Sequence, residues 1–243
     1  MAIANVNATY QGTIEYTDIT TKGYFDWNAD IRTQATGSTA TTITSNSSVS
    51  NAINVQNFAA KGAYYGVVKR TFGFFDVSSY TSGSSFISSA TLRVLGYANN
   101  SGGVIPVEGT AWGVSGTKST LFVEDFSQLD FSTTYASAIT SWSTTAWNDF
   151  TLNATAISDM NSNGYFNVAL INDTYDQANT TLPPETSEFN GVEFLDASFP
   201  MRLYIVWTAG PSGYGNNING VTSANIGKVD GVATADINTV IGV

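Results

Sequence analysis

Short runs of β-branched and aromatic residues constrain the fold of this chain more than any other feature of its sequence. Four such runs stand out, and they are GTIEYTDI (12–19), ATLRVLGY (90–97), YFNVALI (165–171) and MRLYIVW (201–207). The first two alternate apolar and polar residues, as half-buried strands do. Clusters of Ser, Gly and Asn separate the runs, and these residues favour turns. The pattern predicts many short strands joined by turns.

Helical signals are weak by comparison. Only NATAISDMNSNG (Asn153–Gly164) has the length and spacing of a short helix, with Asn or Thr as its N-cap and Gly164 as its stop. The polar segment 36–55 predicts a long loop or an edge hairpin. Many short strands with turn signals at fairly even spacing predict an all-β fold. We therefore expect an antiparallel β-sandwich or a jelly-roll-like domain.

Three segments follow from these signals. The sandwich is predicted over 1–207, where most of the 5 Trp, 12 Tyr and 14 Phe of the chain are available to fill a core. TAGPSGYGNN (208–217) follows the last strong strand, and its Gly and Pro residues indicate a linker. The remaining residues, 218–243, form a C-terminal segment with a pattern of its own.

The composition excludes several classes of function. A formal net charge of −10, from 9 basic and 19 acidic residues, disfavours nucleic acids and anionic membranes as partners. No apolar run approaches the ~20 residues of a membrane-spanning helix. The sequence has no Cys and no His, which excludes thiol nucleophiles, Cys/His zinc sites and the Ser-His-Asp triad. Acidic oxygens could bind Ca²⁺, but the sequence shows no Ca²⁺-binding loop of the EF-hand type, so it identifies no metal site, and we expect no cofactor.

The C-terminal segment is an imperfect 11-residue repeat. INGV (218–221) is echoed by VDGV (229–232) and again by VIGV (240–243). The spacing of its apolar residues sustains neither the period of a strand nor that of a helix. Its apolar positions are Ile218, Val221, Ala224, Ile226, Val229, Val232, Ala235, Ile237, Val240 and Val243, and its fixed glycines are Gly220, Gly231 and Gly242.

The glycines indicate short strands with a turn in each copy. Asn219-Gly220 and Asp230-Gly231 are turn dipeptides, and a glycine inside a helix costs about 1 kcal/mol. Repeat units usually need three or more copies to bury their apolar faces, and this chain has barely more than two. We expect the repeat to bury that face against sister chains, with a trimer favoured, or against a larger assembly. An ordinary final hairpin packed on the sandwich is the alternative.

The middle of the chain resembles a known family. KRTFGFFDVSSYTSGSSFISSATLRVLGY (69–97) is similar to the opening strands of the DNRLRE-type β-sandwich of phage virion and bacterial surface proteins, at Arg70, Phe75, Asp76 and 88–92. SWSTTAWNDFTLNATAISDMNSNGYFNVALI and FPMRLYIVW resemble its later strands, although Phe199-Pro200 replaces the usual Asp-Pro. The resemblance extends over roughly 55–207 and implies a non-catalytic sandwich used for display, spacing or adhesion.

The repeat resembles the sequences that end many structural proteins of tailed phages. The matching positions include Ile218, Ala224, Lys228 and Gly231. The two resemblances together imply a non-enzymatic virion protein, either a capsid decoration or head fibre or a tail-fibre-like component, with capsid and other virion proteins as partners. MAIANVNATYQG at the start of the chain lacks the features of a signal peptide, which agrees with release by cell lysis.

Acidic residues are the first candidates for a catalytic site. Glycoside hydrolysis uses pairs of carboxyl groups, and two sets of acidic residues are candidates. They are Glu124 with Asp125, and the group Glu185, Glu188, Glu193 and Asp196. Such a pair must face each other across roughly 5–9 Å, with one raised pKa. Solvated carboxylates are the simpler interpretation in so acidic a chain.

Aromatic residues and one arginine are candidates for binding. Several aromatic residues lie in or near turn-rich segments, and they are Trp112, Trp142, Trp147, Tyr24, Phe25 and Trp27. Their rings could stack on host-surface glycans. A carbohydrate-binding or adhesin module is therefore the alternative function. Filling of the core is the other interpretation. Arg70 lies in a strand-like run and could hold a ligand carboxylate, although an Arg–Asp pair within the fold explains it more simply.

Overall fold

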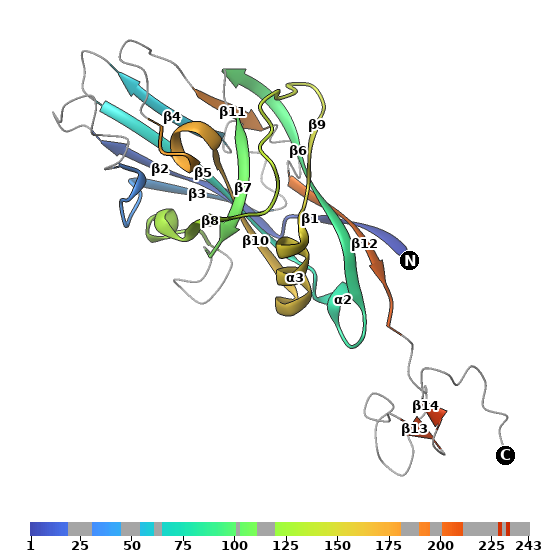
Figure 1. Cartoon of the computed structure of the whole chain (residues 1–243). Helices are drawn as coiled ribbons and strands as arrows, with labels where there is room; N and C mark the ends of the chain where they lie inside the picture. The colour runs from blue at the N-terminus through green and yellow to red at the C-terminus, as the bar shows by residue number, and fades with distance from the viewer. Residues whose placement is uncertain are drawn as a thin grey trace.

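The chain folds into two antiparallel β-sheets that pack as a sandwich, which confirms the predicted all-β class (Figure 1). The computed structural model describes residues 1–18, 31–44, 54–60, 65–100, 103–110, 120–180, 190–194, 201–210, 228–229 and 232–233. All pairings between neighbouring strands of these residues are antiparallel. All four predicted strand runs lie in strands over their described residues, with Ile19 of the first run outside the description.

The first sheet has the strand order β1-β12-β6-β9. Its strands are β1 (Ala2–Asn7), β12 (Met201–Thr208), β6 (Phe86–Asn100) and β9 (Trp147–Thr151). β1 pairs with β12 along all six of its residues, although it lies about 200 residues away in the sequence. Among the described strands, β1 and β9 form the two edges of this sheet.

The second sheet is built around β5 (Tyr65–Asp76). One side of β5 pairs with β2, and the other side pairs first with β4 and then with β10. β10 continues to β7 and β8, β2 continues to β3, and β4 continues to β11. These strands are β2 (Tyr10–Asp18), β3 (Thr39–Thr44), β4 (Asn54–Ala60), β7 (Val104–Gly109), β8 (Leu129–Thr134), β10 (Tyr165–Asn172) and β11 (Asn190–Phe194).

The long strand β6 joins the two sheets. Its residues from Phe86 to Val94 pair with β12, and those from Gly96 to Asn100 pair with β11. The register of β11 against β6 shifts between Glu193 and Phe194, as expected where a strand passes from one sheet to another. The prediction of a strand over 90–97 was therefore right in type and too short in extent.

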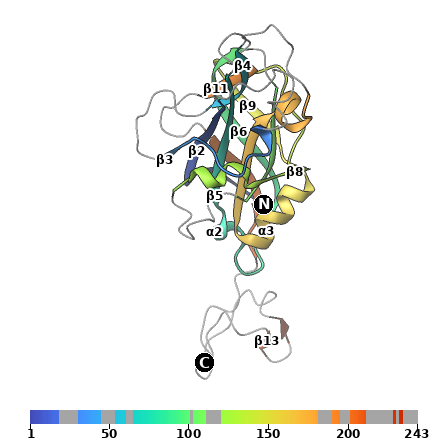
Figure 2. The ribbon, with the colours of Figure 1, turned by 90° about the vertical axis from the view of Figure 1, so that its left-hand side faces the viewer.

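The predicted helix is α3 (Ala154–Asn163). The Asn153 side chain accepts a hydrogen bond from the Ala156 N–H, and Gly164 ends the helix in the left-handed conformation (φ 70°). Such an N-cap and C-terminal glycine are common helix ends. α3 packs on β10 and β6 (Figure 2). Further helical turns among the described residues include α2 (Ser78–Thr81), η1 (Val123–Ser127) and η2 (Asp173–Gln177).

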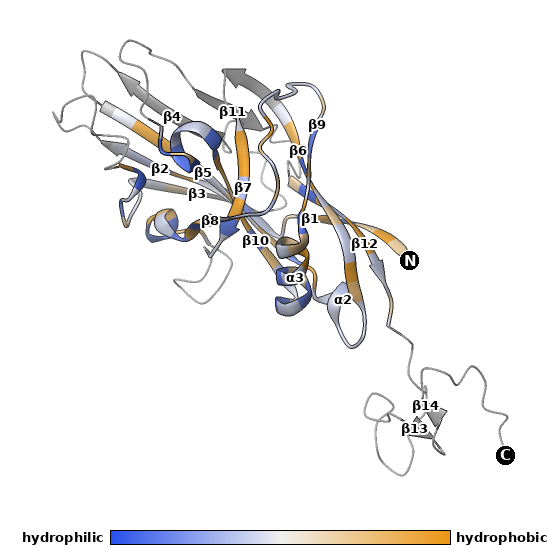
Figure 3. Ribbon diagram, viewed as in Figure 1, coloured by the Kyte–Doolittle hydropathy of each residue, from blue (hydrophilic) through white to orange (hydrophobic). Residues whose placement is uncertain are grey.

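Hydrophobic side chains cover both faces of the second sheet. Alternate residues of β10 divide between two cores, so that Phe166 and Val168 belong to one and Ala169 and Ile171 to the other. The first core lies between the two sheets and α3, and the second is closed by η1 and the segment around Ile31. Figure 3 shows hydrophobic stretches on β7 and β10, and hydrophilic residues on α3. A central strand buried on both faces explains why YFNVALI is almost continuously apolar.

Two other sequence predictions have clear outcomes. The polar segment 36–55 contains β3, an edge strand that pairs only with β2 among the described strands, and residues 45–53 lie outside the described part of the chain. In the C-terminal repeat, β13 (Lys228–Val229) pairs with β14 (Val232–Ala233) as a separate two-stranded sheet. No described helix has the length and hydrophobicity needed to cross a membrane.

Candidate functional site

A small polar pocket lies where β7, β10 and α3 meet. Its volume is about 150 Å³, and its lining residues are Glu108, Gly109, Thr110, Tyr135, Asp159, Asn163, Tyr165 and Asn167. Glu108 is at the end of β7, opposite Val168 of β10. Asp159 and Asn163 are four residues apart on α3, so they share one face of that helix. The pocket thus collects polar groups from three elements that are distant in the sequence.

Two carboxyl groups set the chemistry of the pocket. Partial burial raises the pKa of Glu108, and the negative charges of Asp159 and Asp130 raise it further. The hydroxyl of Tyr135 donates a hydrogen bond of 2.8 Å to Asp159. Burial, that hydrogen bond and the nearby carboxylates raise the pKa of Tyr135, so this hydroxyl stays protonated at neutral pH. The pocket therefore presents carboxylate acceptors that suit hydroxyl or amino groups.

The pocket has limits as a site for chemistry. Its volume lies below the 300–1,000 Å³ of typical small-molecule sites. In the part of the chain that the structure describes, no group of three or more His, Cys, Asp or Glu residues is placed to hold a metal ion. The residue types and the raised pKa of Glu108 are compatible with weak binding of a polar group.

Arg70 is fully buried and paired with an aspartate. Its Nε and Nη2 donate hydrogen bonds of 2.8 Å to the two carboxylate oxygens of Asp176. Its other hydrogen bonds go to the main-chain carbonyls of Phe126 (2.7 Å) and Arg32 (2.8 Å). Both charged side chains have an exposed fraction of 0%. The predicted Arg–Asp pair is thus present, and the alternative of a ligand grip does not fit, because the guanidinium cannot meet a ligand.

Asp176 is held in place by its own loop and by a second arginine. The Asn172 side chain accepts hydrogen bonds from the N–H groups of Thr174 and Tyr175, which fixes the start of η2. Arg32 binds the main-chain carbonyl of Asp176, and its guanidinium lies 3.7 Å from the centroid of the Phe131 ring. The pair therefore joins β5, η1, η2 and the segment around Ile31 in the second core.

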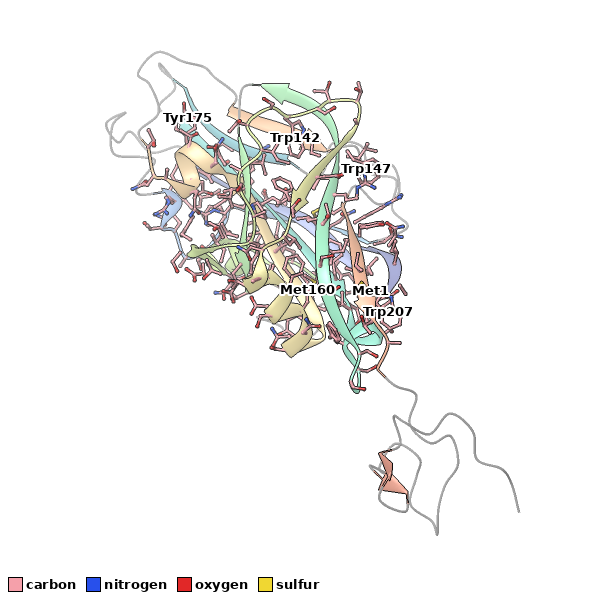
Figure 4. The ribbon with its side chains drawn as sticks, turned by 45° about the vertical axis from the view of Figure 1, so that its right-hand side comes forward. Met1, Trp142, Trp147, Met160, Tyr175 and Trp207 are labelled. Carbon is pink, nitrogen blue, oxygen red and sulfur yellow. The ribbon has the colours of Figure 1, made fainter. Side chains whose placement is uncertain are left out.

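The three tryptophans proposed as glycan contacts differ in exposure. Trp142 is 6% exposed and belongs to the core between the sheets, so the structure corrects its assignment as a glycan contact. Trp147 is half-buried at the start of β9, and the guanidinium groups of Arg93 and Arg202 lie 5.4 and 4.9 Å from its ring centroid. Figure 4 labels both side chains beside β6. Trp112 and the group Tyr24, Phe25 and Trp27 lie outside the described residues.

The acidic residues singled out from the sequence do not form a described catalytic pair. Glu124 is exposed in η1, whereas Asp125 is buried and accepts a hydrogen bond of 3.0 Å from the Phe122 N–H. Asp125 thus stabilises the start of η1, which corrects its assignment as a catalytic candidate. Glu193 lies in β11, but its side chain is not among the described ones. Glu185, Glu188 and Asp196 lie outside the described residues.

Most of the C-terminal repeat also lies outside the described residues. Val229 and Val232 are the apolar repeat positions that fall in strands, and they pair with each other. The two residues between these strands are Asp230 and Gly231, the dipeptide for which a turn is predicted. The other repeat positions named above are not described, so their role in assembly stays a prediction.

No sequence pattern predicted the pocket, or the two partly exposed arginines that lie beside Trp147. Glu108 and Asp159 are 51 residues apart in the sequence, and neither stands in a recognisable motif. The alternation of side chains along a strand predicts on which face of its own strand each of Arg93, Trp147 and Arg202 lies. Their proximity depends on which strands pair, and no local pattern carries that information.

Two comparisons with known proteins found no relative of this chain. No protein-family model matches this chain. A search of curated proteins found no match either.

Proposed function

We propose that this protein is a non-enzymatic structural component of a tailed-phage virion, a capsid decoration, head fibre or tail-fibre-like part. In this proposal the sandwich is displayed on the particle surface, and the C-terminal repeat joins copies of the chain or attaches them to capsid. The proposal rests on the repeat and on the family resemblances. The absence of Cys and His from the sequence agrees with a non-catalytic role.

The observation that carries the assembly role is the pairing of β13 with β14. Lys228 pairs with Ala233 and Val229 with Val232, and two residues separate the strands. The pairing of these two short strands agrees with the short strands that the glycine positions predict for each copy of the repeat. An isolated two-stranded hairpin is at best marginally stable in water. Strands of two residues therefore need further apolar contacts, and the same repeat in sister chains can supply them.

The test uses the full-length chain with charges placed in the repeat. The double substitution Val229→Asp with Val232→Asp puts two carboxylates on the proposed apolar interface. We expect it to reduce the solution mass from that of an oligomer, with a trimer favoured, to that of a single chain. The control, Thr222→Asp with Thr234→Asp, adds the same charge at polar positions of the repeat and should leave the oligomer intact. Light scattering measures both masses.

A second measurement addresses the virion. Purified particles are assembled with each variant, and the bound copies are counted from stained gels. The Val229→Asp and Val232→Asp variant should be lost from particles, whereas the threonine control should remain. An unchanged mass together with unchanged attachment would exclude an assembly role for the repeat.

A second candidate function is contact with glycans on the host surface. Trp147 favours it, because its ring is half-buried on the first sheet and lies beside two arginines. Aromatic rings with neighbouring polar groups are a common surface for sugar stacking.

A further inference from the structure

Two arginines lie directly opposite each other on the outer face of the first sheet, the face that points away from the second sheet. In β12, Met201, Leu203 and Ile205 are buried, so the alternate residue Arg202 points to the outer face. Arg202 pairs in register with Arg93 of β6. Like charges directly opposite each other on neighbouring strands destabilise a sheet. This pair therefore needs a compensating interaction.

One carboxylate compensates only one of the two charges. Asp149 of β9 pairs in register with Arg93, and its Oδ1 lies 2.8 Å from the Arg93 Nε. Both side chains are partly exposed, at 33% for Arg93 and 46% for Asp149. Within the described part of the chain Arg202 has no ion pair, and its buried Nε has no hydrogen-bond partner.

Arg202 is exceptional among the basic side chains that the structure describes. The other four are Arg32, Lys69, Arg70 and Arg93, and each lies within 4 Å of a carboxylate. The chain has 19 acidic and only 9 basic residues, so a cation without a carboxylate is not explained by composition. A charge left uncompensated in an otherwise consistent fold is a feature expected at a functional site.

The ring of Trp147 lies beside the guanidinium groups of both arginines. Its ring centroid is 4.9 Å from the guanidinium carbon of Arg202 and 5.4 Å from that of Arg93. These cation–π contacts restrict the arginine side chains before a ligand arrives, which lowers the entropy lost on binding. Tyr204, two residues further along β12, lies on the same face and is partly exposed. The face thus combines two aromatic side chains with a guanidinium that has no carboxylate partner among the described residues.

We propose that this face binds a sugar acid, a pyranose ring that carries a carboxylate. The carboxylate accepts hydrogen bonds from the guanidinium of Arg202, and the C–H face of the ring packs on Trp147. A neutral sugar leaves the charge of Arg202 uncompensated. The proposal deepens the second candidate function by naming its ligand class, and it does not depend on the C-terminal repeat.

The experiment compares two ligands that differ only in the carboxylate. Methyl β-D-glucuronide and methyl β-D-glucoside are titrated into the full-length protein, and two-dimensional NMR or calorimetry measures their affinities. Hydrogen bonds to charged groups are strong enough that the glucuronide should bind at least about tenfold more tightly than the glucoside. Arg202→Gln should remove this preference. Lys69→Gln removes a partly exposed positive charge on the second sheet, and it should change the affinity by less than about twofold.

A gain-of-affinity variant separates binding from folding. Asp149→Asn removes the carboxylate that compensates Arg93, so that two guanidinium groups become available to the ligand. We expect tighter binding of the glucuronide to this variant, a result that misfolding cannot produce. The thermal unfolding of each variant is recorded in parallel.

Four results would overturn the proposal. Equal affinities for the two glycosides would show that the face is at most a neutral stacking surface. Undetectable binding of both, or a glucuronide affinity that Arg202→Gln leaves unchanged, would exclude this face as the site. Tighter binding of an aspartate-containing peptide than of the glucuronide would assign the face to a protein partner. Each result leaves the test of the repeat unaffected, because that test measures mass and attachment.

Discussion

The substitution Asp176→Asn removes the negative charge of the buried pair with Arg70 while keeping the size of the side chain. Arg70 would keep the carbonyls of Phe126 and Arg32 as acceptors, but its charge would have no full counter-ion in a site that is 0% exposed. Removing one partner of a buried ion pair costs about 3–5 kcal/mol. For a protein of this size, that loss corresponds to a fall in Tm of about 6–20 °C.

The control for this prediction is Asp149→Asn, which breaks an ion pair at the surface. Its partners are 33% and 46% exposed, and such pairs contribute about 0–1 kcal/mol. Urea unfolding followed by fluorescence measures the free energy of unfolding of both variants and of the parent protein. A loss for Asp176→Asn no larger than that for Asp149→Asn would refute the reasoning.

A double substitution identifies the uncompensated charge as the cause. Arg70→Met with Asp176→Leu removes both charges and fills the site with apolar groups. Such replacements of buried ion pairs are often neutral or stabilising by a few kcal/mol relative to the intact pair. We therefore expect the double variant to be more stable than Asp176→Asn alone. A double variant less stable than the single one would show that packing at this site, and not charge, determines the loss.

Three further predictions concern the pocket and the helix beside it. The pKa of Glu108 is raised in the folded protein, so stability falls as the pH rises from the ordinary pKa of a glutamate to the raised pKa, and the loss is complete above it. Glu108→Gln should therefore raise stability at pH 7, by less than about 1 kcal/mol, and have no such effect below about pH 4, as urea unfolding at both pH values can measure. Gly164→Ala should lower the free energy of unfolding by about 1–2 kcal/mol, because φ is 70° at this residue, whereas an added Cβ would meet only ordinary contacts at 3.6 Å. Gly164→Asn should lower it by less, and urea unfolding measures both variants. Asn153→Ala should lower the stability by about 1 kcal/mol, because it removes the N-cap of α3. The control is Thr155→Ala, at an exposed position of α3, and thermal unfolding measures both variants.

Elements with a strong local signal were predicted from the sequence. α3 begins after Asn153 and ends at Gly164, because a side-chain cap and a residue tolerant of positive φ act over a few residues. The runs at 165–171 and 201–207 became β10 and β12, because β-branched and aromatic residues pack well on a sheet. β1 was not predicted, since AIANVN carries no strong strand pattern and its pairing partner lies at the other end of the chain.

The candidate sites were harder to predict than the strands. Arg70 was expected to pair with an aspartate, but Asp176 could not be identified, because the partner lies 106 residues away. Trp142 and Trp147 have similar sequence surroundings, yet one fills the core and the other lies on the outer face. Burial depends on which face of a strand meets another sheet, and that contact is tertiary.

By itself, the sequence determined the all-β class, the ends of α3, the acidic net charge and the exclusion of chemistry that needs Cys or His. Those properties follow from composition and from interactions within a few residues of each other. The tertiary structure alone decided that β6 joins the two sheets, that Arg70 meets Asp176 and that Arg202 faces Arg93. Each of these depends on strand register between distant segments, and register is set by the burial of whole faces against each other.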